Sequence, residues 1–301
     1  MSIWEKIKKE YAGRAIVTLC GLLIIGLTLM ISIFLIKQGS VSFTKFGHSL
    51  SEFLFSSEWD PKDTPGESGG KIGSAIYIVG SISTCGLALL LATPLAIGAA
   101  VFMAEISPGW GTRLFRPAVE IFVGIPSIVY GWIGLTVLVP LIRDLFHAPM
   151  GGYSVLAAGI VLAVMIFPTI TTVSTDAILS VPAKYKTAAY GLGSTRWQLI
   201  RKVILPAASP GILSGIVLGL ARAFGEALAV AMVIGKTRSF PQNILSPTNN
   251  LTAAIAADMG NSANGGEHAT ALWSMALLLF IISMICILAI HLIAHLGKEK
   301  G

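Results

Sequence analysis

Two oppositely charged residues, Arg222 and Glu226, stand four positions apart in the otherwise apolar stretch ARAFGEALAV. On a continuous helix, residues at i and i+4 share a face, so these side chains could form an ion pair. A guanidinium group suits oxyanions because its planar fork donates two parallel hydrogen bonds and stays charged when dehydrated. Gly225 between them would let a ligand or another backbone approach closely. The pair therefore predicts either an anion site or an internal ion pair that only offsets its own desolvation.

The elements that must hold this pair are membrane-spanning helices. Of the 301 residues, 54% are hydrophobic and 12% are charged, and the mean hydropathy is +0.79. A span needs about 20 apolar residues. Six such runs predict an all-α polytopic membrane protein with six transmembrane helices. The runs cover residues 15–36, 72–103, 117–142, 153–173, 210–234 and 270–293.

The basic residues predict the orientation of these spans, because Lys and Arg are retained on the cytoplasmic side. With both termini inside, thirteen of the 21 Lys and Arg residues lie on cytoplasmic segments, seven lie outside, and only Arg222 falls within a span. Arg222 stands 11 residues beyond Gly211, which is roughly 16 Å along a helix and near the middle of the hydrocarbon core. The first run is too long for a signal peptide and is predicted to remain as a span. The net charge of +6 then indicates no nucleic-acid partner.

No pattern typical of an enzyme is found in the sequence. Cys20, Cys85 and Cys286 lie in separate predicted spans, and the five histidines are scattered. His291 and His295 stand at i and i+4 near a helix end, where they are expected to lie at the membrane interface rather than to bind a metal. There is no nucleophile elbow, glycine-rich phosphate loop or pair of catalytic carboxylates. The sequence therefore predicts a protein with no catalytic residues, metal or cofactor of its own.

A polar island, TAAYGLGSTRWQLIRKVILPAASPGI, separates the fourth and fifth predicted spans. Residues 183–190 are predicted to form a short helix, Gly193 permits a sharp turn, and Ser194 or Thr195 can cap a second helix that Pro206 ends. The result would be a helix, a turn and a helix parallel to the cytoplasmic surface of the membrane. From the residues alone, the island could equally be a connecting loop whose basic residues serve topology only.

The spacing within this island resembles the EAA loop of ABC importer permeases, whose form is E-A-A-x3-G-x9-I-x-L-P. The match runs through Ala188, Ala189, Gly193, Leu205 and Pro206, while Thr187 stands where the family has Glu and Val203 where it has Ile. The resemblance implies that the island docks into a groove on a cytoplasmic ATPase. The apolar face of its second helix, with Trp197, Ile200 and Ile204 at helical spacing, is expected to fill that groove.

Other stretches extend the resemblance along most of the chain. SSEWDP (56–61), RPAVEIFVGIPSIVYG (116–131), FPTITTVSTDAILSVP (167–182) and ARAFGEALAVAMVIG (221–235) are similar to phosphate importer permeases of the PstC type. This resemblance implies the ABC importer permease fold, inorganic phosphate as substrate, and ATP hydrolysis by a partner. The implied partners are a second, PstA-like permease, a dimer of PstB-like ATPase subunits, a PstS-like extracytoplasmic phosphate-binding protein, and the lipid of a bacterial inner membrane.

The resemblance also implies roles for particular residues. Arg222 would bind phosphate, Ser127 in the GIPS stretch would donate a hydroxyl, and Glu226 would accept the proton that hydrogenphosphate carries and sulfate lacks. Coupling to the ATPase is implied for Thr187, Ala188, Ala189, Gly193, Trp197, Leu205 and Pro206. The alternatives are a permease for sulfate, molybdate or tungstate, and a stand-alone channel or secondary transporter, which would not need a coupling loop.

Three parts of the chain are expected. Residues 1–71 hold the cytoplasmic tail, the first span and an extracytoplasmic segment; residues 72–293 form the permease domain, with its coupling loop at about 182–209; residues 294–301 form a second cytoplasmic tail. In the outer segment 238–269, Leu251, Ile255 and Met259 repeat at helical spacing, which predicts a short amphipathic helix near the outer surface.

Overall fold

Six long apolar helical runs form the body of the protein. The computed structural model describes residues 3–62, 69–263 and 265–298. Within these ranges, the runs long and apolar enough to cross a membrane are Gly13–Thr44, Ala75–Ile106, Ser127–Phe146, Met150–Leu179, Arg196–Gly225 and Glu267–Leu292. The six-helix, all-α prediction is therefore confirmed. Parts of the predicted outer segment 38–70 and of the 294–301 tail lie outside the described residues.

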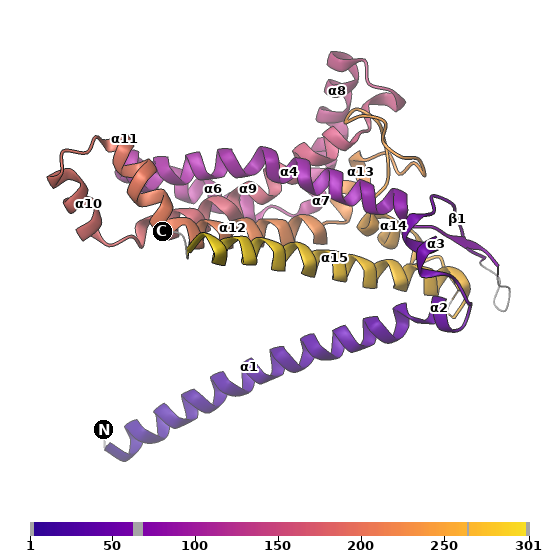
Figure 1. The fold of residues 1–301 in the computed structure, drawn as a ribbon, viewed down its shortest axis with the longest axis horizontal. Helices are drawn as coiled ribbons and strands as arrows, with labels where there is room; N and C mark the ends of the chain where they lie inside the picture. The colour runs from indigo at the N-terminus through magenta and orange to yellow at the C-terminus, as the bar shows by residue number, and fades with distance from the viewer. Residues whose placement is uncertain (1–2, 63–68, 264, 299–301) are drawn as a thin grey trace.

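The elements follow one another as shown in Figure 1. They are α1 (Ile3–Gly39), α2 (Val41–Thr44), α3 (Leu50–Phe55), β1 (Trp59–Asp60), β2 (Lys71–Ile72), α4 (Ala75–Val101), η1 (Phe102–Ile106), α5 (Pro108–Trp110), η2 (Gly111–Phe115), α6 (Arg116–Gly124), α7 (Ser127–Ile133), η3 (Gly134–Leu138), α8 (Val139–Phe146), η4 (Met150–Gly152), α9 (Val155–Leu179), α10 (Ala183–Gly191), α11 (Arg196–Leu199), η5 (Ile200–Ile204), α12 (Leu205–Gly225), α13 (Leu228–Val233), α14 (Leu251–Asp258) and α15 (Glu267–Lys298). The segments η1, η2, η3 and η5 are π-helical and continue neighbouring α-helices.

The centre of the bundle is formed by α4, α9 and α12, which run along one another (Figure 1). Small residues make this close packing possible, because they let helix backbones approach. Ala92 and Ala96 of α4 are buried. A Cβ atom added to Gly159 of α9 would lie 2.6 Å from the side chain of Leu87, and one added to Gly219 of α12 would lie 2.7 Å from Ile170.

The first helix lies apart from this bundle. In Figure 1, α1 diverges from the other helices and approaches α15 only near its own C-terminal end. There the Ser274 hydroxyl donates a 2.7 Å hydrogen bond to the Gly39 carbonyl, and the Phe34 and Trp273 rings meet edge to face with centroids 5.2 Å apart. From Ala15 to Ile31 the apolar side chains of α1 are exposed, as expected for a helix that faces lipid or another subunit.

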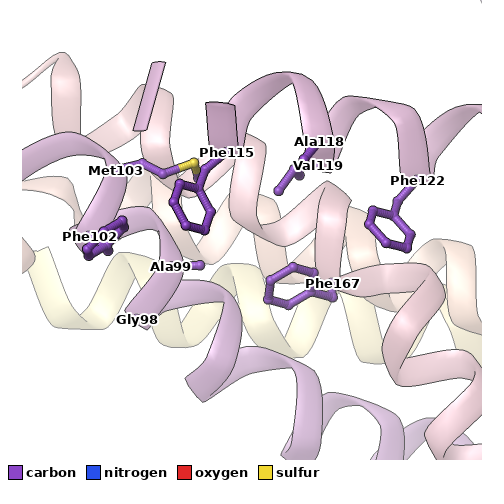
Figure 2. A pocket seen from close by; sticks show the side chains of 9 residues that line it. All are labelled: Gly98, Ala99, Phe102, Met103, Phe115, Ala118, Val119, Phe122 and Phe167. Atoms are coloured by element: carbon purple, nitrogen blue, oxygen red, sulfur yellow. The ribbon is translucent and has the colours of Figure 1, made fainter. Parts of the chain in front are cut away.

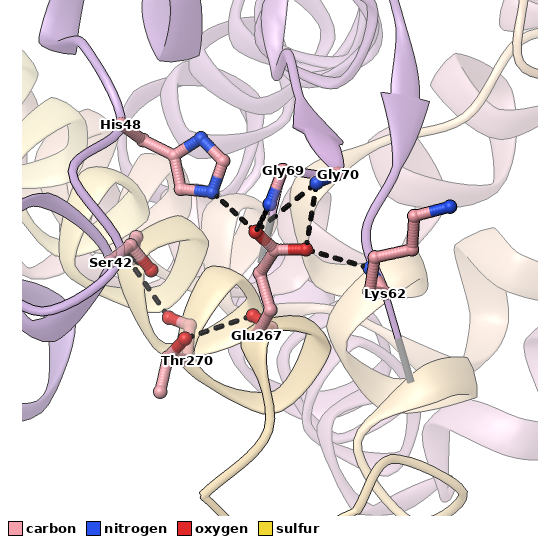
Figure 3. A network of polar contacts seen from close by, with 8 residues as sticks. Ser42, His48, Lys62, Gly69, Gly70, Glu267 and Thr270 are labelled. Carbon is pink, nitrogen blue, oxygen red and sulfur yellow. Dashed lines mark hydrogen bonds and ion pairs between the residues drawn. The ribbon is translucent and has the colours of Figure 1, made fainter. Parts of the chain in front are cut away.

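A buried carboxylate ties the segment after α1 to the start of α15 (Figure 3). The Glu267 side chain is inaccessible to solvent, and its Oε1 atom lies 2.8 Å from Nε2 of His48. Its oxygens also accept backbone N–H bonds of 2.8 Å from Lys62 and 3.1 Å from Gly69 and Gly70. A buried charge is stable only with such partners, so the cluster holds the outer loop against the bundle.

The helices α2, α3 and α14 and the strands β1 and β2 form a cap at the end of the bundle opposite α10 and α11 (Figure 1). The strands β1 and β2 form a two-stranded antiparallel sheet, with Trp59 opposite Ile72. The hydrogen bond and charge of Glu58 raise the pKa of the Lys71 ammonium beside it. Helix α14 confirms that a helix carries Leu251 and Ile255, but it ends at Asp258, before Met259. The predicted amphipathic surface helix is wrong, because Leu251, Thr252, Ala253 and Ala254 are all buried where α14 packs against α4 and α15.

Candidate functional site

Two of the membrane-spanning segments are broken, and the breaks differ from the unbroken spans predicted over 117–142 and 210–234. Helix α6 ends at Gly124, and the backbone is extended at Ile125 and Pro126 before α7 begins. Helix α12 ends at Gly225, where Glu226 takes an extended conformation with ψ of 118° before α13 begins. The half-helices α7 and α13 pack together: a Cβ atom on Gly131 would lie 2.8 Å from the Ala229 backbone.

Arg222 and Glu226 lie at one of these breaks, but the predicted ion pair between them is wrong. Arg222 is half-buried in the last turn of α12, and its Nη1 atom donates a 3.4 Å hydrogen bond to the Thr169 hydroxyl of α9. The Glu226 carboxylate instead accepts a 3.1 Å hydrogen bond from the backbone N–H of Ala229. The physical reason is that the helix ends at Gly225, so Glu226 does not continue on the face that carries Arg222.

The third predicted site residue, Ser127, is the first residue of α7, directly after the break that follows α6. Ser127 is half-buried at the start of α7, and one turn later the Tyr130 hydroxyl donates a 2.7 Å hydrogen bond to the carbonyl of Phe122. The N-terminal end of the 20-residue run Ser127–Phe146 carries positive potential at the break between α6 and α7. Sequence reasoning missed Thr169 and Tyr130.

The turn predicted in the coupling loop at 182–209, from here on the coupling region, is confirmed. Helix α10 ends at Gly191, and Gly193 adopts a left-handed conformation with φ of +78°, which glycine takes without strain. The Thr195 side chain then caps α11 by accepting the N–H of Gln198, whose own side chain accepts the N–H of Thr195. Of the two predicted caps, Thr195 is the one used.

The prediction that Pro206 ends the second helix is wrong. The π-helical segment η5 carries α11 into α12 without interruption, and the whole run extends from Arg196 to Gly225. Pro206 is the second residue of α12 and directly follows η5, so it lies inside this run rather than at a free helix end. In Figure 1, α11 lies across the end of the bundle whereas α12 runs along it, so the run bends at this point. π-Helical turns and prolines are usual causes of such bends.

The apolar residues of the coupling region divide into a buried and an exposed set. Ile200 and Ile204 are buried within the protein's own core. The prediction that these two side chains fill a groove on another subunit is therefore wrong. Trp197 of the same predicted face is 65% exposed and Leu192 is 88% exposed. The exposed apolar and aromatic residues of this region are Tyr185, Tyr190, Leu192 and Trp197. Thr187 and Ala188 are exposed beside them, whereas Ala189 is buried.

An apolar hollow of about 600 Å³ lies between α4, α6 and α9 (Figure 2). Four aromatic rings contribute to its walls, those of Phe102, Phe115, Phe122 and Phe167. Helix α9 contributes Phe167 to the hollow and Thr169 to the contact with Arg222. Helix α6 contributes Phe122 to the hollow, and the Phe122 carbonyl accepts the hydrogen bond from Tyr130.

The fold and these two regions define a class of membrane protein. The chain belongs to the binding-protein-dependent transport system inner membrane component family, whose model matches residues 96–299. It is therefore a multi-pass permease subunit of an ABC importer, which works with an ATPase and a binding protein and is not itself an enzyme.

Individual relatives resemble the chain over most of its length. It is 47% identical over 289 residues to the probable ABC transporter permease protein YqgH of Bacillus subtilis, which covers 96% of this chain and 92% of that one. It is 38% identical over 280 residues to the phosphate transport system permease protein PstC of Pasteurella multocida, covering 86% of this chain and 84% of the relative.

Solved structures share the fold at lower identity. A chain of the MetNI methionine ABC transporter in an inward-facing conformation superposes with a TM-score of 0.57 at 22% identity, covering 74% of this chain and 96% of that one. A bacterial alginate ABC transporter in complex with its periplasmic protein gives a TM-score of 0.60 at 18% identity, covering 99% of this chain and 98% of the other. These similarities establish the ABC importer permease fold.

Proposed function

We propose that this chain is the PstC-type permease subunit of an importer that moves inorganic phosphate across a bacterial inner membrane. The observation that carries the proposal is the setting of Arg222 at the broken end of α12, whose continuation α13 packs against α7. An arginine has five N–H donors, and among the described residues Arg222 uses one of them, in a long 3.4 Å bond to Thr169. The remaining donors are available to an oxyanion. The names of the PstC relatives support phosphate as that anion.

Three side chains would divide the work of binding. Arg222 would hold two phosphate oxygens with its planar fork, and Ser127 would donate its hydroxyl from the start of α7. Glu226 would accept the proton of hydrogenphosphate, a contact that turns repulsive for sulfate. These three side chains all come from one permease, so we infer that a second permease supplies the residues on the opposite side of the phosphate.

The partners follow from the exposed surface of α10 and α11. We infer that Leu192, Trp197 and Thr187 dock on a PstB-like ATPase dimer, while a PstA-like permease and a PstS-like phosphate-binding protein complete the importer. This assignment places α10, α11 and both chain termini in the cytoplasm. It is supported by Figure 1, where the N-terminal end of α1 and the C-terminal end of α15 lie toward the same end of the molecule as α10.

Substitution of Arg222 tests the site. In proteoliposomes containing the assembled importer, Arg222→Lys and Arg222→Met should each lower phosphate uptake by about tenfold or more, since a hydrogen bond to a charged group contributes about 1.5–3 kcal/mol. Lys should fail with Met because a point charge lacks the bidentate geometry. Copurified ATPase should stay at the normal level.

The matched control is Arg143→Lys, which changes an exposed arginine paired with Asp144 and should leave uptake unaltered. Competition by sulfate, molybdate and tungstate separates phosphate from the other oxyanions. Full uptake by an assembled Arg222→Met importer would remove Arg222 from the site, and displacement of phosphate by an equal concentration of sulfate would reject phosphate as the preferred substrate.

A further inference from the structure

The π-helical segment η1, at the end of α4, is bound by side chains from both helices of the coupling region, α10 and α11. The Nζ atom of Lys186 on α10 donates a hydrogen bond to Oε1 of Glu105 and forms an ion pair with it. From α11, Nη2 of Arg196 donates to the backbone carbonyl of Glu105 and, over 2.9 Å, to that of Ile106. The side chain of Glu105 is only 11% exposed and that of Lys186 27%, so the ion pair is largely shielded from water.

These contacts fall where a helix needs them. The last carbonyls of a helical run lack intrahelical partners, and η1 ends at Ile106. Arg196 supplies donors to these carbonyls, and a cation at a helix C-terminus is favourable. Behind the polar contacts, Ala104 belongs to the same buried cluster as Leu199 and Ile204. The coupling region therefore holds η1 through both polar and apolar contacts.

Another side of η1 faces the hollow. Phe102 and Met103 line it together with Phe122 of α6 and Phe167 of α9 (Figure 2). Helix α9 carries both Phe167 in this wall and Thr169, the hydrogen-bond partner of Arg222. A displacement of η1 would therefore change the walls of the hollow and press on the helix that contacts Arg222.

We propose that the Lys186–Glu105 ion pair and the Arg196 contacts pass movement of α10 and α11 to α4 and η1. This proposal rests on the proposed function, in which a docked ATPase moves the coupling region. Apolar packing alone lets helices slide over one another by small amounts, whereas two charged side chains anchored at adjacent residues oppose sliding. Lys186, Arg196 and Glu105 are thus positioning residues, and the two basic residues do more than set the topology.

A double-mutant cycle tests the link in the reconstituted importer. Glu105→Gln and Lys186→Gln should each lower the number of phosphate ions moved per ATP hydrolysed by at least about fivefold, the lower end of typical coupling between sites. The double variant should be no worse than either single variant, because both act through one ion pair. Lys186→Arg retains the charge and should retain coupling. Lys184→Gln, an exposed lysine on the same helix, is the matched control.

A second readout does not depend on the transported anion. Trp110 is exposed four residues beyond η1, and a dye on Trp110→Cys, in a chain with its three native cysteines replaced by alanine, reports movement there. ATP should change the dye signal in the parent and Lys184→Gln importers, and Lys186→Gln should abolish that change. If the parent responds to ATP but moves no phosphate, the proposed substrate fails while the link stands.

Several outcomes would overturn the link. One is a normal ratio of phosphate to ATP in assembled Glu105→Gln and Lys186→Gln importers. Another is a double variant in which the fold-decrease in phosphate moved per ATP equals the product of the decreases in the two single variants. A third is a loss of uptake in proportion to the loss of assembled complex, because the contacts would then stabilise the complex without transmitting movement. If Glu105→Gln does not assemble, the comparison of Lys186→Gln with Lys186→Arg decides the question by itself.

Discussion

The carboxylate of Glu226 already has a role in holding the break after α12. Its Oε1 atom accepts the N–H of Ala229 over 3.1 Å, while its backbone carbonyl accepts a 2.9 Å bond from the Thr252 hydroxyl of α14. Within the described chain, the second carboxylate oxygen has no hydrogen-bond partner. That oxygen is available for the proton of hydrogenphosphate without disturbing the contact to Ala229.

Replacement of Glu226 by Gln separates these two roles. An amide oxygen can still accept the Ala229 N–H, so the break should survive, but the negative charge that repels sulfate is lost. We expect the ratio of phosphate to sulfate uptake to fall by at least about tenfold, since a hydrogen bond involving a charged group contributes about 1.5 kcal/mol or more. Uptake of both labelled anions is measured in proteoliposomes, with Glu58→Gln, a surface acid, as the control. An unchanged ratio would leave Glu226 with its structural role alone.

At this scale, sequence distance decides what can be predicted. Arg222 is noticeable because a charge in an apolar run is costly, and Gly193 because a turn needs it. Thr169 lies 53 residues from Arg222 and Glu105 lies 81 residues from Lys186, so neither contact leaves a local pattern. The ion pair expected between Arg222 and Glu226 failed because it assumed that the helix continues.

At the scale of elements, proline is an uneven guide to where helices break. The break before α7 coincides with Pro126 and has a sequence signal. Pro94, Pro168 and Pro210 nevertheless lie inside helices, and Pro206 lies inside the continuous helical run Arg196–Gly225. The break after Gly225 has no proline. It depends on the packing of α13 against α7 and on the bond from α14, which are tertiary contacts.

The turn between α10 and α11 depends on the left-handed conformation of Gly193. A non-glycine residue in that conformation costs about 1–2 kcal/mol, and a β-branched side chain is the least tolerated. Gly193→Val should therefore disturb the turn, lower the amount of copurified ATPase and lower phosphate uptake by about tenfold. A Cβ atom at this position would meet nothing within 4 Å, so the effect is conformational rather than steric.

The matched control for this substitution is Gly191→Val. A Cβ atom there also meets nothing within 4 Å, and the φ angle of Gly191 is not positive. ATPase copurification and uptake should stay close to normal in this variant. Equal behaviour of the two variants would show that the turn is not what the ATPase requires.

At the scale of the whole molecule, the two ends of the bundle differ in character. One end carries α10 and α11, and the ends of α1 and α15 lie toward it; the other carries the cap of α2, α3, β1 and α14 (Figure 1). An even number of spans returns the chain to the side on which it began, in agreement with the six runs found. The number of spans could be predicted because each needs a long apolar run. The cap could not, since its buried Glu267 cluster joins segments about 200 residues apart.

The sidedness of the molecule is tested by labelling single cysteines placed at its two ends. Leu192, 88% exposed, lies in the turn between α10 and α11, and Asn261 is exposed beyond α14. The excess of basic residues on one set of segments predicts that Leu192 is cytoplasmic and Asn261 is outside. In a chain whose Cys20, Cys85 and Cys286 are replaced, an impermeant thiol reagent should label Asn261→Cys in intact cells and label Leu192→Cys only after the cells are opened. A membrane-permeant reagent should label both and serves as the control for reactivity. Labelling of Leu192→Cys from outside would contradict the orientation, and with it the docking of a cytoplasmic ATPase on α10 and α11.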